Sequence, residues 1–156
     1  MISLEPFTKR RFADRFDYKG EPETMVTTTT YDAKGITVVV DGIYLTGFSE
    51  SMVAVEKTEN NYEVKVGAQG DTLRTKVNNP LGTITVTLLA TSPQAAHLDK
   101  LAATGRLVSV TVINAGPPKE TVTAAEAFVV KPANRSYGNE AEDREYEIQC
   151  MDMTFN

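Results

Sequence analysis

A change of hydrophobic period in the middle of the chain constrains the fold more than any other feature of the sequence. In residues 83–89 (TITVTLL) apolar residues alternate with threonines, which is the period of a strand with one buried face. The next segment, Ser92–Thr104, has the spacing of a helix instead, and the alternation returns in residues 107–113 (LVSVTVI). The sequence therefore predicts a single helix set between strands.

The ends of this helix carry their own signals. Ser92 can cap the backbone N–H groups of the first turn, and Pro93 suits the first helical position. Gly105 follows the last turn, where a left-handed residue is favoured. Three apolar residues between these ends share one helical face: Leu98, Leu101 and Ala102.

The rest of the chain from about residue 25 consists of short apolar runs separated by turn residues. Further strands are expected over residues 36–40, 43–46, 52–58, 62–66, 72–77, 122–131 and 144–155. Asp41-Gly42 separates the first two runs, and this pair favours a type I′ hairpin turn because both central residues need positive φ. We therefore predict a mainly β domain over residues 25–156, an antiparallel β-sandwich or barrel with one flanking α-helix over about Ser92–Thr104.

One segment, Glu56–Asn79, becomes polar while keeping strand alternation. Tyr62, Val64 and Val66 fall on one side of its first strand, and Leu73 is the main apolar residue of its second strand. A lone ribbon with so little apolar surface is marginal in water. Either it is a long hairpin completed by a neighbouring subunit, with these four residues as assembly contacts, or it is a mobile loop.

The last segment is apolar on both sides. Tyr146, Ile148 and Cys150 share one face, whereas a second set shares the other. Those residues are Met151, Met153 and Phe155, which we expect to be further assembly contacts. Either a bulge shifts the phase or both faces are covered, and a terminal strand covered on both faces indicates a contact between proteins.

Residues 1–24 differ in composition from the domain that follows. Their phenylalanines are interleaved with basic residues, but five acidic residues balance the five basic ones. Phe7, Phe12 and Phe16 are expected to anchor this N-terminal arm to a neighbouring subunit or to an outer protein layer. The alternative is that the arm folds back on its own subunit.

The net charge of −5 belongs entirely to the domain, since the arm sums to zero. An acidic body argues against binding to a nucleic-acid backbone, which needs a dense basic surface. It is compatible with a surface past which nucleic acid moves without adhering, because like charges repel within about 8 Å at physiological salt. Simple solubility explains the same charge.

Motifs for catalysis or cofactor binding are missing from the sequence. There is no glycine-rich nucleotide loop, no nucleophile elbow and no Cys or His pair at metal-ligand spacing. Cys150 is in phase with buried strand residues, and His97 lies on the predicted helix as a surface or interface residue. The acidic run of Glu140, Glu142, Asp143 and Glu145 is typical of a solvated loop. We expect no enzyme, no cofactor and no metal site.

Neither a membrane span nor a secretory leader is evident, since the apolar runs are short and the first eighteen residues carry charges throughout. The single cysteine fits a reducing compartment. We therefore expect assembly in a cytoplasm.

Several segments together resemble the family of phage proteins that form the inner tube of long tails. They are residues 36–47 (ITVVVDGIYLTG), 66–70 (VGAQG), 78–89 (NNPLGTITVTLL), 91–105 (TSPQAAHLDKLAATG) and 131–146 (KPANRSYGNEAEDREY). The resemblance implies a β-sandwich or barrel with one helix, assembled as sixfold rings that stack into a hollow tube. It implies a sheath, a baseplate and a tail terminator as partners, a place in the virion tail, and DNA that passes through the lumen without specific binding. The added residues 1–24 depart from the pattern.

Three classes of function follow. The first is a tube subunit of a contractile phage tail, and the second is a tube subunit of a tailocin or type VI secretion-like machine that delivers no genome. The third is an unrelated β-sandwich binding module or enzyme, which is the least supported class because no site emerges from the sequence.

Overall fold

The computed structural model describes residues 27–156, so the N-terminal arm lies outside it. Residues Tyr31–Asn156 form one compact unit that contains every helix and strand described below. The strands are β1 (Ile36–Val40), β2 (Ile43–Tyr44), β3 (Phe48–Lys57), β4 (Tyr62–Val66), β5 (Thr72–Lys76), β6 (Gly82–Leu88), β7 (Val108–Asn114), β8 (Glu120–Val129), β9 (Arg144–Cys150) and β10 (Met153–Phe155). The helices are the short 3-10 helix η1 (Ala33–Gly35) and α2 (Ala95–Thr104), and none in residues 27–156 is long and apolar enough to cross a membrane.

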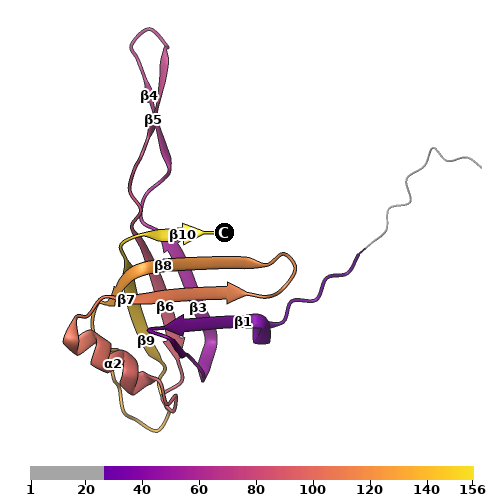
Figure 1. Cartoon of the computed structure of the whole chain (residues 1–156), viewed down its shortest axis with the longest axis vertical. Coiled ribbons are helices and arrows are strands. Elements are labelled where there is room, and N and C mark those ends of the chain that lie inside the picture. Colours follow the sequence, from indigo (N-terminus) through magenta and orange to yellow (C-terminus); the bar gives the residue numbers. More distant parts are fainter. Residues whose placement is uncertain (1–26) are drawn as a thin grey trace, which may run out of the picture. The chain divides into compact units, whose positions relative to one another are not determined.

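Two layers of antiparallel strands enclose the core, as the sequence predicted (Figure 1). The strand order is β2-β1-β7-β8-β9-β6-β3, and β10 pairs with β8. β8 belongs to both layers, because its residues Val122–Ala124 pair with β10 and its residues Ala127–Val129 pair with β9. In Figure 1 the strands β1, β7 and β8 run across β3, β6 and β9, with α2 at one end of the layers. The two strands β4 and β5 pair only with each other within the described chain.

The core follows the alternation seen in the sequence. On β6 every second residue from Gly82 to Leu88 is buried. The same pattern holds on β9, where Tyr146 and Ile148 face Val86 and Ile84 across the ladder. Both strands are central in the sheet, so each buries one row of side chains and the fold fixes their register.

The Asp41-Gly42 turn is confirmed. Asp41 has φ 53° and Gly42 has φ 76°, and Val40 pairs directly with Ile43 across a two-residue loop. Both central residues are left-handed, as a type I′ turn requires.

The helix is confirmed, but its start is wrong by three residues. α2 begins at Ala95, after a turn that contains Pro93, and Gln94 makes no capping bond to it. The Ser92 hydroxyl donates to the carbonyl of Thr46 at 2.6 Å, so it ties the turn to the β2–β3 loop and does not cap the helix. At the other end Gly105 has φ 63° and donates to the carbonyl of Leu101, as predicted.

The prediction of a single terminal strand over residues 144–155 is wrong, because the chain bends at Met151 and Asp152 and continues as β10. The Asp152 carboxylate accepts from the Glu126 backbone N–H at 3.0 Å, and the Met151 N–H donates to the Glu126 carbonyl. Whereas β9 pairs with both β6 and β8, the chain after this bend pairs, among the strands of residues 27–156, with β8 alone. The second apolar face of the segment thus belongs to a separate strand with its own partner.

Candidate assembly surfaces

The hairpin β4–β5 is exposed along its whole length, and Figure 1 shows it extending beyond the two layers. All ten residues of its two strands are exposed. Four of them are large apolar or aromatic residues, with exposed fractions of 46% to 66%: Tyr62, Val64, Val66 and Leu73. The sequence predicts these same four residues as assembly contacts.

The register divides the hairpin into two unlike faces. Directly opposed residues of an antiparallel pair share a face. Tyr62, Val64 and Val66 are opposed by Lys76, Arg74 and Thr72. We call these six residues the basic apolar face.

Leu73 lies on the other face, because it is opposed by Lys65. Glu63 and Thr75 share that side. The four residues that the sequence grouped together therefore cannot all contact one flat partner surface.

On the basic apolar face, Arg74 stacks over Tyr62, with its guanidinium carbon 3.7 Å from the ring centroid. A cation over an aromatic ring is stabilised by about 0.5–1 kcal/mol at an exposed site. This contact holds the Arg74 charge above the apolar stripe.

The three residues proposed on the last segment have different environments. Met153 is 8% exposed and belongs to the core, where a Cβ added to Gly82 would lie 2.5 Å from its Sδ. Met151 and Phe155 are 41% and 52% exposed. Of the three residues, only these two have exposed side chains.

An apolar groove of about 590 Å³ opens between the layers, next to Phe155. Its apolar lining comes from five strands: Ile36, Val53, Val55, Val112, Val122 and Phe155. Glu120 is the one charged residue among those that line it, and Tyr31 stands beside it with 72% of its surface exposed. Sequence reasoning missed this groove, because its residues are far apart in the chain and each one alternates like an ordinary core residue.

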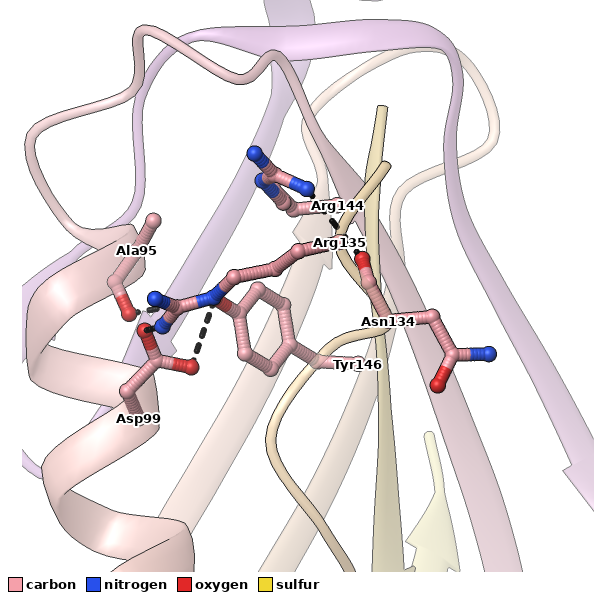
Figure 2. A network of polar contacts seen from close by, with 6 residues as sticks. All are labelled: Ala95, Asp99, Asn134, Arg135, Arg144 and Tyr146. Atoms are coloured by element: carbon pink, nitrogen blue, oxygen red, sulfur yellow. Dashed lines mark hydrogen bonds and ion pairs between the residues drawn. The ribbon is translucent and has the colours of Figure 1, made fainter. Parts of the chain in front are cut away.

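A polar network joins the helix to the sheet (Figure 2). The Tyr146 hydroxyl lies 3.0 Å from Asp99 Oδ1 and 3.1 Å from the carbonyl oxygen of Ala95. Arg135 donates to Asp99 Oδ2 at 2.5 Å. Burial, and after it the hydrogen bond to Asp99, raises the pKa of Tyr146 to about 12. The hydroxyl is therefore a weaker acid than an ordinary tyrosine and keeps its proton as a hydrogen-bond donor.

The segment between β8 and β9 is fastened by the same network. Arg144, at 9% exposure, donates to the carbonyl of Asn134 at 3.2 Å and lies 5.4 Å from the ring centroid of Tyr137. Together with the Arg135–Asp99 pair, this contact secures the segment against α2 (Figure 2). These residues have a structural role, because they hold the segment between β8 and β9 in place.

Cys150 is fully buried, as expected, and burial raises the pKa of its thiol to about 11. His97 is half-buried on α2. No cluster of His, Cys, Asp or Glu in the described part of the chain could hold a metal ion, and the acidic run 140–145 forms none. Phe7, Phe12 and Phe16 lie outside the described residues.

Residues 27–156 thus form a β-sandwich with an exposed apolar hairpin and an open apolar groove. The chain belongs to the family of the bacteriophage PhiTE tail tube protein, whose model matches residues 26–155. Its place is therefore in the tail, and membership in a structural family indicates a role that is not enzymatic.

The fold is also similar to subunits of contractile injection systems. The tube terminating cap of the anti-feeding prophage has a TM-score of 0.62 and 9% identity over 89% of this chain and 99% of that chain. The sheath/tube terminator of the extracellular contractile injection system PVC, in its extended state, has a TM-score of 0.64 and 12% identity, covering 85% and 99%. A chain of the PVC sheath-tube complex has a TM-score of 0.60 and 12% identity, covering 81% and 91%. At these identities the likeness shows the fold alone, and no curated protein sequence matches the chain.

Proposed function

We propose that this protein is the subunit of the inner tube of a contractile phage tail, stacking as sixfold rings into a hollow conduit for DNA. The observation that carries the proposal is the family match over nearly the whole domain. The exposed apolar hairpin supports it, because such a ribbon gains a core only from a neighbouring subunit. A tail sheath, a baseplate and a tail terminator would be its partners, and assembly would take place in the host cytoplasm.

Electron microscopy of the purified protein tests this proposal directly. We expect rings or tubes at high protein concentration. A monodisperse monomer under the same conditions would refute it.

Excision of the hairpin tests its role in assembly. The Val77 N–H donates to the carbonyl of Asn61 at 2.9 Å, so the hairpin leaves and re-enters the domain at adjacent points. Replacing residues 62–76 by Asn-Gly should therefore leave a folded subunit that no longer polymerises. Deleting only residues 60–71 would remove β4 and leave β5 without its partner strand, so the result would be harder to interpret. Tubes formed by the excised protein would contradict the assignment.

The acidic excess of the domain would be displayed in part on the inner wall of the tube, so that DNA passes without adhering. An electrostatic map of the assembled tube decides this point. A strongly basic lumen would end the idea.

The N-terminal arm would contact a neighbouring subunit or the sheath through Phe7, Phe12 and Phe16. A protein that starts at Met25 should then melt like the full chain as a monomer but form weaker tubes. Equal tube stability with and without the arm would rule out this role.

A tube that delivers no genome is the second candidate. It is favoured by the similarity of the fold to subunits of the anti-feeding prophage and of an extracellular contractile injection system. The neighbouring genes separate the two candidates, since only a phage encodes a capsid beside the sheath.

A further inference from the structure

The apolar groove lies between two strand edges that have room for another strand. β3 pairs with β6 alone among the strands of residues 27–156, so its outer edge is open. β1 pairs with β2 at Val39 and Val40, and the Leu45 N–H donates to the Val38 carbonyl, so its edge is open only at Ile36 and Thr37. Open edges offer backbone N–H and C=O groups to an extended chain. The groove is therefore suited to a β-ribbon.

The subunit does not fill this groove with its own hairpin. Every residue of β4 and β5 is exposed, and none of them lines the groove. Within residues 27–156 the groove is therefore left free for the hairpin of another molecule.

Charge indicates which molecule that is. Residues 62–76 carry three basic and two acidic residues, whereas the rest of residues 27–156 carries eight basic and fourteen acidic ones. The hairpin is thus a basic projection of an acidic protein, and its Arg74 and Lys76 lie on the same face as its apolar stripe. The groove offers the complementary surface, apolar inside with Glu120 as its charged residue.

We propose that the basic apolar face of the β4–β5 hairpin docks in the apolar groove of a second copy of this chain. Val64 and its neighbours enter the groove, and Arg74 approaches Glu120 of the second copy. The other face of the hairpin, with Lys65 and Leu73, stays outside the contact. This inference rests on the proposed tube function and names the surfaces that the tube would use.

Because the hairpin and the groove are different surfaces, the contact is head-to-tail. Each subunit then offers one hairpin and one free groove, and the contact repeats from copy to copy. Such a contact generates rings where the rotation closes and helical polymers where it does not. It needs no other protein to propagate.

Cysteine cross-linking tests the contact directly, since the native Cys150 is fully buried. The full chain with Val64→Cys and Phe155→Cys is assembled and treated with a mild oxidant. We expect a ladder of disulfide-linked oligomers on a non-reducing gel. The matched control is Leu73→Cys with Phe155→Cys, which places the first thiol on the opposite face and should give no ladder.

The outcomes separate the contact from the function. Tubes without a ladder from either variant, or equal ladders from both, would overturn the docking while leaving the tube function intact. An intramolecular disulfide would show that the hairpin reaches its own groove, and it would overturn the second copy as occupant. Failure of the wild-type protein to form tubes would instead refute the proposed function.

Charge reversal provides an independent test. Arg74→Glu should raise the protein concentration needed for tubes about tenfold, and Lys65→Glu, with the same change of charge on the other face, should leave it unchanged. Adding Glu120→Arg to Arg74→Glu should restore assembly. Equal effects of Arg74→Glu and Lys65→Glu, or no restoration by Glu120→Arg, would contradict the pairing.

Discussion

Tyr146→Phe should destabilise the subunit by removing one hydroxyl from a buried network. The Tyr146 ring is 1% exposed, and its hydroxyl donates to Asp99 or to the Ala95 carbonyl at about 3 Å. The change keeps the ring and its packing, so the loss reports on the hydrogen bond alone. The hydroxyl of Tyr146 links β9 to α2, and no other side chain in residues 27–156 bonds to the Ala95 carbonyl.

The magnitude follows from the charge of the acceptor. A hydrogen bond to a charged group contributes roughly 1.5–3 kcal/mol. Asp99 keeps its bond to Arg135 after the substitution and is 22% exposed, so water can replace the lost donor in part. We therefore expect a loss near the lower end, about 1.5 kcal/mol, which corresponds to roughly 3–6 °C in Tm for a domain of this size.

Urea unfolding of the dispersed subunit at neutral pH measures this loss. The control is Tyr44→Phe, since Tyr44 is 65% exposed and no hydrogen bond of its hydroxyl occurs within the described chain. We expect the control to change the free energy of unfolding by less than about 0.5 kcal/mol. If both variants unfold alike, the network does not fasten the helix and the reasoning is wrong.

The pH dependence gives a second readout of the same residue. Tyr146 has a pKa of about 12 in the folded protein against an ordinary value of 10.0, so folding favours its neutral form. The stability that this shift contributes is fully present below pH 10 and is lost as the pH rises toward 12. Tyr146→Phe should remove this loss and keep the alkaline loss that Cys150 causes, which begins nearer pH 9. Identical alkaline profiles of the two proteins would refute the assignment.

Three further predictions follow from single features of the fold. Gly42→Ala should cost about 1 kcal/mol because Gly42 has φ 76°, and Gly138→Ala, at an open position without positive φ, should cost nothing measurable by urea unfolding. Leu98→Ala should cost about 2–5 kcal/mol by the same measurement, since Leu98 is a fully buried residue of α2; a loss below 1 kcal/mol would show that the helix is not packed as described. Cys150 should resist a thiol reagent at neutral pH until urea unfolds the subunit, because it is buried and its pKa is about 11; rapid labelling of the native protein would contradict this.

Local patterns predicted the elements whose structure depends on local forces. The alternation of residues 83–89 predicted β6, because a strand with one buried face must place every second side chain inward. Asp41-Gly42 predicted its turn for the same kind of reason, since the two left-handed residues are set by the turn itself. Gly105 likewise marked the end of α2.

The features that the sequence did not predict depend on partners distant in the chain. Ser92 is a good capping residue, but the Thr46 carbonyl, 46 positions earlier, binds its hydroxyl instead. The bend after Cys150 depends on Glu126, which no pattern in the last segment reveals.

The candidate assembly surfaces likewise include one that the sequence predicted, the hairpin, and one that it did not, the groove. Exposure of Tyr62, Val64 and Val66 followed from the polar surroundings of their segment in the sequence. The groove did not, because it exists only where two layers meet and fail to close.

The separation of the hairpin from the core has an evolutionary consequence. Residues 62–76 supply no side chain to the core cluster, and their strands share no ladder with the large sheet in the structure described. Substitutions there are free of the packing constraint that governs β6 or β9, and in the tube that we propose selection would act on them only through the surface that the hairpin meets. Related tubes can therefore diverge in which subunits they accept while the domain that carries the hairpin keeps its fold.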